Sequence, residues 1–364
     1  MIQVNVELAE RSYPIYIGTS ELESMIQKTS VAIPDWTHSV VMVDATLAEF
    51  ANKNIVSLFQ AAGKRTTLLT IPSGESSKSI GMLAELWSGM VQAKADRKSV
   101  VVAVGGGVVG DLAGFAAASY TRGLRFVQIP TTLLAMVDSS VGGKTGVNLP
   151  EAKNMIGAFW QPHAVCIDTS TLHSLPDREY WSGLAEVVKY GVILDESFFA
   201  YLESNASAIV KRTPSAVEHI VKRSCELKAH VVSQDERETT GLRAILNYGH
   251  TFGHAIEACT SYGRYLHGEA IAIGMTMAAN LATRMQLWPA LCAERQLSLL
   301  KQLNLPTQFS GVPSEQLIAA MQLDKKTEHG KLNFILPKMI GKVEQVRNCN
   351  HDDILASIAS ARID

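Results

Sequence analysis

Residues 98–119 read K-S-V-V-V-A-V-G-G-G-V-V-G-D-L-A-G-F-A-A-A-S, and this stretch decides the fold. Its valine run predicts a buried strand, its glycines a turn and its alanine-rich end a helix. Because glycine has no Cβ, backbone N–H groups in such a turn can approach a pyrophosphate at the helix N-terminus. The spacing G-G-G-x-x-G differs from that of a plain Rossmann unit, which also carries an acidic residue about 20 positions on. The stretch therefore predicts a dinucleotide site, or else a tight turn that only permits close packing.

Similar strand and helix patterns lie on both sides of this stretch. Strands are expected within 1–17 and at 39–44, 65–71, 98–104, 125–130 and 164–168, and helices at about 45–63, 80–93 and 112–120. Strands that alternate with helices in this way form a parallel sheet with helices on both faces. The first half is therefore predicted to be a doubly wound, Rossmann-like α/β domain.

The sequence V-G-G-K-T-G-V-N, residues 141–148, places glycines beside Lys144. It resembles a phosphate loop only loosely, because Asp138 stands where the first glycine of G-x-x-x-x-G-K-[ST] belongs. Lys153 and Asn154 follow in E-A-K-N. For any single one of these lysines, a solvated surface position is the better explanation.

The pattern changes near Asp177, where strand-like runs give way to long amphipathic stretches. Helices are expected at 178–193, 196–210, 214–236, 244–260, 268–285 and 290–303. Residues 323–337 predict a basic loop that leads into a short strand. We expect an α/β domain over residues 1–177 and an all-α domain over residues 178–364.

Two histidines, His250 and His254, stand four apart in N-Y-G-H-T-F-G-H-A-I-E, residues 247–257. Together with His267 and Glu186 they supply imidazoles and a carboxylate, which can bind a divalent metal such as zinc and leave one position open. The pattern is not the H-E-x-x-H of metalloproteases. It also does not say which of the two histidines is the ligand, and hydrogen-bonded core histidines remain the alternative.

Further polar residues share the spacing of this segment. Arg243, Asn247, His250 and His254 are separated by four, three and four positions, which predicts one continuous stripe on a helix. Glu186 and Lys189 are three apart and are expected to face the same way. A polar stripe of this kind is unusual for a core face and indicates the wall of a site.

Composition limits the function classes. The chain of 364 residues is 47% hydrophobic with a formal net charge of -2, which favours a folded protein and gives no reason to expect nucleic acid or a membrane as partner. The five cysteines form no C-x-x-C pair, so a reducing, cytoplasmic compartment is expected. The alternating N-terminus predicts a strand rather than a signal peptide.

Eight motifs spread over nearly the whole chain carry a resemblance to a known family. They are P-S-G-E-S-S-K, G-G-G-V-V-G-D, P-T-T-L-L-A, D-S-S-V-G-G-K-T-G-V-N, K-N-M-I-G-A-F, G-L-A-E-V-V-K, G-L-R-A-I-L-N-Y-G-H-T-F-G-H-A-I-E and L-H-G-E-A-I-A-I-G-M. Through them the chain closely resembles the 3-dehydroquinate synthase family of sugar phosphate cyclases. The resemblance implies NAD bound by the α/β domain, zinc or cobalt bound by the helical domain, and a homodimer.

The resemblance also implies roles for single residues. The implied metal ligands are Glu186, His250 and His267. The implied NAD contacts are Asp44, Ser73, Gly74, Glu75, Ser76, Ser77, Lys78, Gly105, Gly106, Gly107, Val108, Val109, Gly110, Asp111, Thr131, Thr132, Lys144, Lys153, Thr171, Leu172, His173 and Ser174. The implied substrate and catalytic residues are Asp138, Lys144, Lys153, Asn154, Lys189, Lys228, Arg243, Asn247, His254 and Lys325. Lys326 matches the place of Lys325 as well, and one extra residue in D-E-R-E-T-T-G-L-R leaves the role of Glu238 open.

The implied activity is that of a carbon–oxygen lyase of the shikimate pathway, which leads to chorismate and the aromatic amino acids. It converts 3-deoxy-D-arabino-heptulosonate 7-phosphate into 3-dehydroquinate and phosphate. The alternatives are a cyclase for another sugar phosphate, a metal-dependent polyol dehydrogenase with an aspartate and three histidines as ligands, and a non-enzymatic NAD or metal sensor.

Overall fold

The computed structural model describes residues 1–260, 263–323 and 332–363. The chain divides into two compact units. The first contains Met1–Leu175 and Ser224–Arg237, and the second contains Pro176–Arg223 and Glu238–Asp364. Helix α8 (Pro214–Gln234) therefore contributes to both units. The expectation of two continuous domains did not include this return of the chain, because a helix that is uninterrupted in sequence gives no signal that it changes unit.

A seven-stranded sheet forms the centre of the first unit, in the order β1-β2-β9-β6-β5-β3-β4. The strands are β1 (Ile2–Val6), β2 (Tyr13–Gly18), β3 (His38–Asp44), β4 (Arg65–Ile71), β5 (Ser99–Gly105), β6 (Arg125–Pro130) and β9 (Ala164–Asp168). Strand β1 runs antiparallel to β2, and the other neighbours pair in parallel. The predicted doubly wound α/β fold is confirmed.

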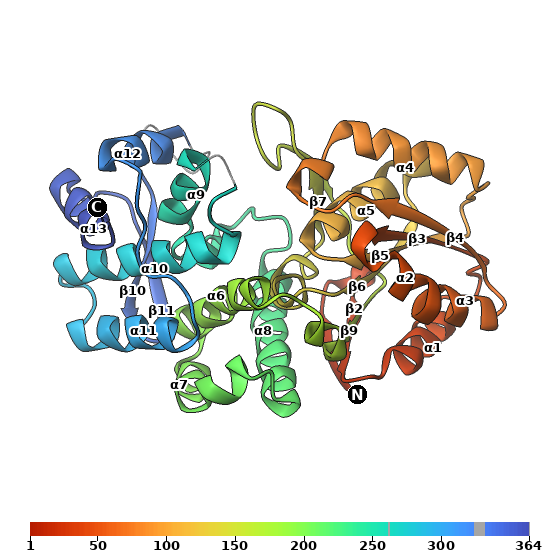
Figure 1. Ribbon diagram of the computed structural model, residues 1–364, viewed down its shortest axis with the longest axis horizontal. Helices are drawn as coiled ribbons and strands as arrows, with labels where there is room; N and C mark the ends of the chain where they lie inside the picture. The colour runs from red at the N-terminus through yellow and green to blue at the C-terminus, as the bar shows by residue number, and fades with distance from the viewer. Residues whose placement is uncertain (261–262, 324–331, 364) are drawn as a thin grey trace. The chain divides into compact units, whose positions relative to one another are not determined.

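Helices cover both faces of this sheet (Figure 1). On β3, Val41 and Val43 pack against α1 (Leu22–Ala32), α2 (Ala48–Ala51) and α3 (Ser57–Ala61). Val40 and Met42 point the other way. They pack against α4 (Ile80–Gln92) and α5 (Gly107–Ser119). Successive side chains of a strand alternate between faces, so a strand buried on both faces is hydrophobic throughout.

After β6 the chain forms a hairpin that the sequence did not predict. Strands β7 (Lys144–Val147) and β8 (Ile156–Phe159) pair antiparallel, with Gly146 opposite Gly157. A Cβ on Gly157 would lie 2.0 Å from the carbonyl oxygen of Thr145, so the two backbones approach too closely for any side chain there. Lys144 thus begins a strand, and the loose likeness of its surroundings to a phosphate loop does not extend to the structure.

The second unit is predominantly helical. Besides part of α8 it contains α6 (Asp177–Leu194), α7 (Glu196–Val210), α9 (His250–Cys259), α10 (His267–Arg284), α11 (Ala290–Gln302), α12 (Ser314–Leu323) and α13 (His351–Ser360). The short strand expected at the end of residues 323–337 corresponds to β10 (Phe334–Met339), but its antiparallel partner β11 (Lys342–Val346) was not expected, so this helical half is not all-α. The expected strand ended at Pro337, whereas β10 continues to Met339 with a shift of register after Pro337.

The single helix predicted over residues 244–260 is interrupted. A 3₁₀ segment, η8, covers Leu242–Asn247, and α9 begins only at His250. Between them Gly249 has a φ of +78°, a conformation that glycine adopts without a Cβ clash. Arg243 and Asn247 therefore do not share a continuous helical stripe with His250 and His254, and that prediction is wrong.

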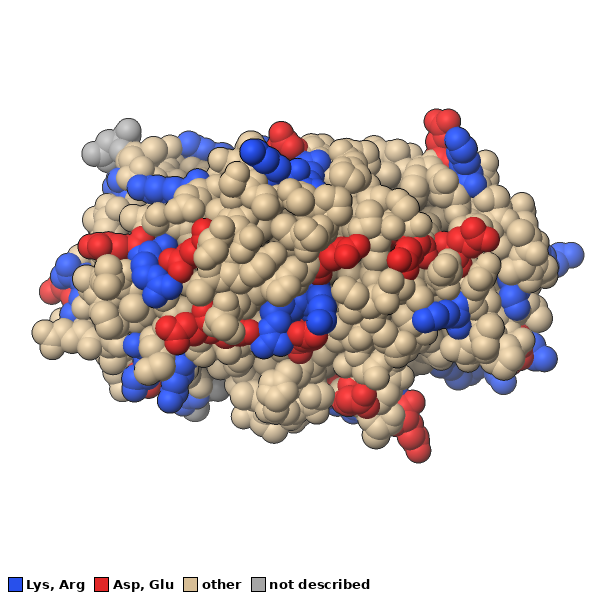
Figure 2. Space-filling model, turned by 90° about the horizontal axis from the view of Figure 1, so that it is seen from below, with Lys and Arg blue, Asp and Glu red and all other residues tan. Residues whose placement is uncertain are grey.

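Charge is evenly distributed on the surface shown in Figure 2. Acidic and basic side chains are interspersed there, and neither sign covers a continuous area. Within residues 1–260, 263–323 and 332–363, no helix combines the length and apolar character needed to cross a bilayer.

Candidate active site

The sheet of the first unit has a topological switch point between β3 and β5. The chain runs from β3 outward to β4 and then returns to β5 on the other side of β3. In open α/β sheets, ligands bind beyond the carboxyl ends of the strands at such a point. Asp44 ends β3 and Gly105 ends β5 at this edge. Asp44 accepts hydrogen bonds from the backbone N–H of Thr46 (2.9 Å) and from the hydroxyl of Ser73.

The glycine turn lies at the same edge and begins a helix of 13 residues. Gly106 is the N-cap of α5. A Cβ on Gly106 would lie 3.1 Å from Cγ2 of Thr132, and one on Gly107 would lie 3.0 Å from Oγ of Ser139. These glycines therefore allow close packing, as the alternative interpretation expected. They also leave the N–H groups of a helix first turn uncovered by side chains, which suits a pyrophosphate. The close packing and the expected dinucleotide site are therefore compatible.

Lys78 connects this turn to other predicted contacts. Its buried Nζ donates to Oδ2 of Asp111 and to Oδ1 of Asn154, both at 2.5 Å. Burial raises the pKa of Asp111, and the charge of Lys78 opposes that rise. The structure thus brings Lys78, Asp111 and Asn154 together.

The remaining expected NAD contacts lie at the ends of β6 and β9. Thr131 is buried, and Thr132 accepts a hydrogen bond from the N–H of Ala135 (3.2 Å). The segment η7 (Thr169–His173) follows β9. Its Leu172 is only 1% exposed, so this side chain serves the core and only its backbone is available to a ligand.

Two of the expected substrate residues form an ion pair within the first unit. Nζ of Lys228 donates to Oδ1 and to the backbone oxygen of Asp138, each at 2.7 Å. Lys228 belongs to the part of α8 that returns to this unit. Lys144 is exposed at the start of β7, and Nζ of Lys153 lies 3.9 Å from Oε1 of Glu75.

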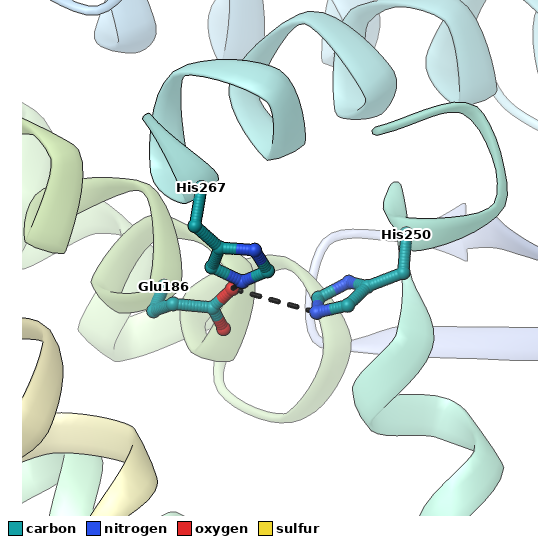
Figure 3. A group of neighbouring side chains, drawn as sticks. All are labelled: Glu186, His250 and His267. Carbon is teal, nitrogen blue, oxygen red and sulfur yellow. Dashed lines mark ion pairs between the residues drawn. The ribbon is translucent and has the colours of Figure 1, made fainter. Parts of the chain in front are cut away.

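Three side chains from three helices converge in the second unit (Figure 3). Glu186 comes from α6, His250 from α9 and His267 from α10. Oε1 of Glu186 lies 3.6 Å from Nε2 of His250 and 3.5 Å from Nε2 of His267. Each residue offers one ligand atom, and these atoms all lie within 4.8 Å of one another. Two imidazoles and a carboxylate are a donor set that suits zinc and leaves a further position for another ligand.

The outer nitrogens of both histidines have partners that orient the rings. Nδ1 of His250 lies 3.0 Å from the carbonyl oxygen of Tyr248, which can only accept, so Nδ1 carries the hydrogen and Nε2 keeps its lone pair. Nδ1 of His267 lies 3.5 Å from Oε1 of Glu257. Such outer partners orient metal-binding histidines and make them better donors. The residues therefore fit a divalent metal.

Electrostatics at His267 also favour a cation. Burial lowers its pKa, but Glu186 and Glu257 outweigh this and raise the pKa to about 10. A cation that binds Nε2 of His267 beside Glu186 therefore displaces a proton from that nitrogen. The buried Lys189 forms an ion pair with Oε2 of Glu186, one helical turn away.

The two histidines that the pattern could not distinguish occupy different places. His250 joins Glu186, whereas His254 lies in a second, more exposed group with Glu257 and His267. Sequence reasoning assigned no role to Glu257, although its position seven after His250 puts it on the same face of a helix. That spacing was the available signal.

Arg243 is almost fully buried in η8, at 3% exposure. Its Nε lies 3.4 Å from Oε1 of Glu238, the residue whose role the sequence left open. Asn247 ends the same segment. Lys325, the last expected substrate residue, lies outside the described residues, as does Lys326.

Solved structures place this architecture in a class. The chain is 26% identical to 2-deoxy-scyllo-inosose synthase complexed with carbaglucose-6-phosphate, NAD+ and Co2+, with a TM-score of 0.88 over 99% of this chain and 100% of that chain. It is 27% identical to 2-epi-5-epi-valiolone synthase from Streptomyces hygroscopicus with NAD+ and Zn2+ bound, with a TM-score of 0.88 and 99% of each chain covered. The fold is that of the sugar phosphate cyclases.

Sequence comparison identifies the family within this class. Residues 68–182 match the model of the 3-dehydroquinate synthase N-terminal domain, and residues 183–327 match that of the C-terminal domain. A curated 3-dehydroquinate synthase from Rhodopirellula baltica is 51% identical, over 99% of this chain and 97% of its own length. The chain belongs to the 3-dehydroquinate synthase family.

Proposed function

We propose that the protein converts 3-deoxy-D-arabino-heptulosonate 7-phosphate into 3-dehydroquinate and phosphate. The observation that carries this conclusion is the convergence of Glu186, His250 and His267 in a chain that is 51% identical to a curated 3-dehydroquinate synthase. The activity is that of a phosphate-eliminating lyase in the pathway to chorismate and the aromatic amino acids.

The reaction has no net change in oxidation state. A substrate hydroxyl is oxidised, which acidifies the neighbouring C–H bond, and phosphate then leaves by elimination. The ketone is reduced again, the ring opens, and aldol addition closes it as a carbocycle. When bound, NAD accepts and returns the two electrons, and zinc or cobalt polarises the hydroxyl.

The residues of the first unit bind the nucleotide and the phosphate in this proposal. The switch-point residues Asp44 and Gly105–Asp111, with the turn that contains Ser73–Lys78, hold NAD. Lys144, Lys153 and Asn154 hold the phosphate, because charged donors make strong hydrogen bonds to phosphate oxygens. The ion pair between Lys228 and Asp138 fixes the Lys228 ammonium for a substrate hydroxyl.

The second unit binds the carboxylate and handles protons. Arg243 offers a planar pair of donors to the substrate carboxylate, a geometry that lysine cannot match. Its ion pair with Glu238 supports that orientation. His254 and Asn247 orient hydroxyls or move protons, and Lys189 holds a substrate oxygen beside Glu186.

One assay tests the proposed function. The purified protein is mixed with the heptulosonate phosphate and a catalytic amount of NAD, and phosphate and dehydroquinate are measured together. We expect equal amounts of both, no accumulation of NADH, and loss of activity with a chelator. Stoichiometric NADH would instead indicate a polyol dehydrogenase, and a protein that binds NAD and zinc without any turnover would indicate a sensor.

The second candidate is a cyclase for a different sugar phosphate, which the TM-scores of 0.88 to two such enzymes favour. A substrate without a carboxylate distinguishes the two. Phosphate release from such a hexose phosphate, at a rate above that from the heptulosonate phosphate, would establish this candidate instead. Arg243 supports the carboxylate substrate.

Assembly and location form a further part of the proposal. A homodimer is expected from the family, and the exposed apolar side chains of Met155, Ile156 and Phe159 support a self-association surface. The five free thiols support a cytoplasmic location. Sedimentation equilibrium tests the dimer, and fractionation of the source cells tests the location.

A further inference from the structure

One asparagine, Asn148, links two segments that the proposed function assigns to different ligands. It follows β7 and is half-buried. We call Ser73–Lys78 the nucleotide turn, because it is an expected NAD contact, and residues 149–154 the phosphate loop, because it carries Lys153 and Asn154. Asn148 hydrogen-bonds to both.

Three hydrogen bonds define this link. Nδ2 of Asn148 donates to Oε1 of Glu75 at 2.7 Å, and the backbone N–H of Asn148 donates to the carbonyl oxygen of Lys78 at 2.8 Å. Oδ1 of Asn148 accepts from the backbone N–H of Asn154 at 2.9 Å. A carboxylate only accepts and an N–H only donates, so the amide cannot be turned round, and no other residue type of this size supplies both groups.

Lys78 closes a ring of hydrogen bonds with Asn148 and Asn154, and it also connects this ring to α5. Lys78 Nζ donates to the side chain of Asn154, and to Asp111 of α5, which directly follows Gly110. Asn154 itself has a φ of +55°, in the left-handed region that asparagine adopts more readily than most residues with a side chain. Hydrogen bonds to both the backbone and the side chain of Asn154 therefore fix the end of the phosphate loop against the nucleotide turn.

We propose that Asn148 is a positioning residue which couples the nucleotide turn to the phosphate loop, so that NAD and the substrate phosphate bind cooperatively. Whichever ligand binds first orders both segments through Asn148, and the second ligand then finds its segment already ordered. This inference rests on the proposed function for the identity of the two ligands.

The experiment measures the NAD dissociation constant by titration calorimetry, without and with saturating inorganic phosphate. In the unsubstituted protein we expect phosphate to tighten NAD binding by about fivefold or more, the lower end of common coupling factors. Because coupling is reciprocal, NAD must tighten phosphate binding by the same factor. This second titration checks the first.

Asn148→Ala should reduce the coupling factor to about 1. Asn148→Asp keeps an acceptor for the N–H of Asn154 but places a carboxylate against Glu75, so it should also uncouple the ligands, and it replaces the alanine variant if that does not fold. The matched control is Asn54→Ala. Nδ2 of Asn54 donates to the backbone oxygen of Phe50 at 3.0 Å, away from both segments, and its loss should leave the factor unchanged.

Two results would overturn the inference. One is an unsubstituted protein in which NAD and phosphate bind independently. The other is an Asn148 variant that binds both ligands and keeps the original coupling factor. Failure of the proposed function is seen separately, as absence of phosphate release in the activity assay, so the two failures are distinguishable.

Discussion

His267 lies between two carboxylates, and each faces a different nitrogen of its ring. Glu186 faces Nε2 and Glu257 faces Nδ1, both at 3.5 Å. A metal that replaces the proton on Nε2 keeps Glu186 as a second ligand. Glu257 then stabilises the hydrogen on Nδ1 and holds the ring orientation. The two carboxylates thus have different expected effects on metal binding.

Removal of a proposed ligand is the most direct test of the metal group. His250→Ala should weaken zinc binding by more than about 100-fold, because loss of an outer partner alone costs about 10- to 100-fold. The zinc dissociation constant is measured by competition with a chromophoric chelator, and activity should fall with zinc content. His351→Ala, at an exposed position at the start of α13, is the control. Full zinc content with full activity in His250→Ala would refute the assignment.

Glu257 should act through His267. Glu257→Ala is expected to weaken zinc binding by about 10- to 100-fold, while Glu257→Gln, which keeps an acceptor oxygen, should lose less. Absorption of the cobalt-loaded protein reports the ligand geometry independently of activity. The control is Glu203→Gln, which disrupts an ion pair with Arg295 elsewhere in the same unit. Unchanged zinc affinity in Glu257→Ala would show that this carboxylate does not support the metal.

At the scale of helices, the crossing of α9 and α10 depends on glycine. A Cβ on Gly274 would lie 2.1 Å from the carbonyl oxygen of Gly249 and 2.8 Å from the N of Gly253. Gly274→Ala should therefore separate the helices that carry His250 and His267, and lower the free energy of unfolding by about 1–3 kcal/mol or more. Gly81→Ala in α4 is the matched control. Its nearest neighbour is Oγ of Ser79 at 3.8 Å, and alanine there should be neutral or stabilising. Urea unfolding measures both.

Elements differ in how far their local sequence predicts them. The strands β3 and β5 are valine-rich and buried on both faces, so their local sequence determines their type. The break at Gly249 depends on contact with α10, which the local sequence does not reveal. The β7–β8 hairpin likewise depends on a glycine-to-glycine approach between residues eleven apart, Gly146 and Gly157. Recognisable motifs predicted the group of Glu186, His250 and His267, which the structure brings together, whereas the contact of Glu257 with His267 became visible only in the structure.

A buried histidine in the sheet makes the first unit sensitive to acid. Nδ1 of His38 faces a donor, Nη2 of Arg65, at 2.8 Å, so it acts as the acceptor, and Nε2 donates to Oγ1 of Thr67 at 2.9 Å. Burial, and then the charge of Arg65, lower the pKa of His38. As pH falls below about 6.5, the unfolded chain therefore takes up a proton before the folded one does.

The free energy of unfolding should consequently decrease as pH is lowered below about 6.5. His38 contributes a loss of at most about 1.4 kcal/mol per pH unit, beginning near the unfolded pKa of about 6.5 and ending at its lower folded pKa. His38→Gln should reduce the dependence of the unfolding free energy on pH between about pH 7.5 and 5.5. Urea unfolding at several pH values measures it. The slope will not vanish, because burial also lowers the pKa of His163. An unaltered slope in His38→Gln would assign the acid sensitivity to other groups.

For the molecule as a whole, local charge matters more than net charge. The formal charge of -2 gives no long-range attraction for an anionic substrate. The first unit instead places Lys78, Lys144, Lys153 and Lys228 among its expected ligand contacts, and the second unit keeps a buried Arg243. Binding of a sugar phosphate should therefore depend on directed contacts, which ionic strength screens less than it screens a surface field.

The division of ligands between the units gives the final prediction. NAD should slow amide hydrogen exchange in the first unit, at the nucleotide turn and the start of α5, and zinc should slow it in the second, at α9 and the start of α10. A ligand stabilises the folded form that binds it, by about 2.7 kcal/mol at 100 times its dissociation constant. Exchange is followed by mass spectrometry with each ligand alone, and His250→Ala with zinc is the control. Zinc protection confined to the first unit would contradict the placement of the metal on Glu186, His250 and His267. Protection of the predicted segments by each ligand would show that both units contribute ligand sites of their own, as a single cyclase that uses NAD and a metal requires.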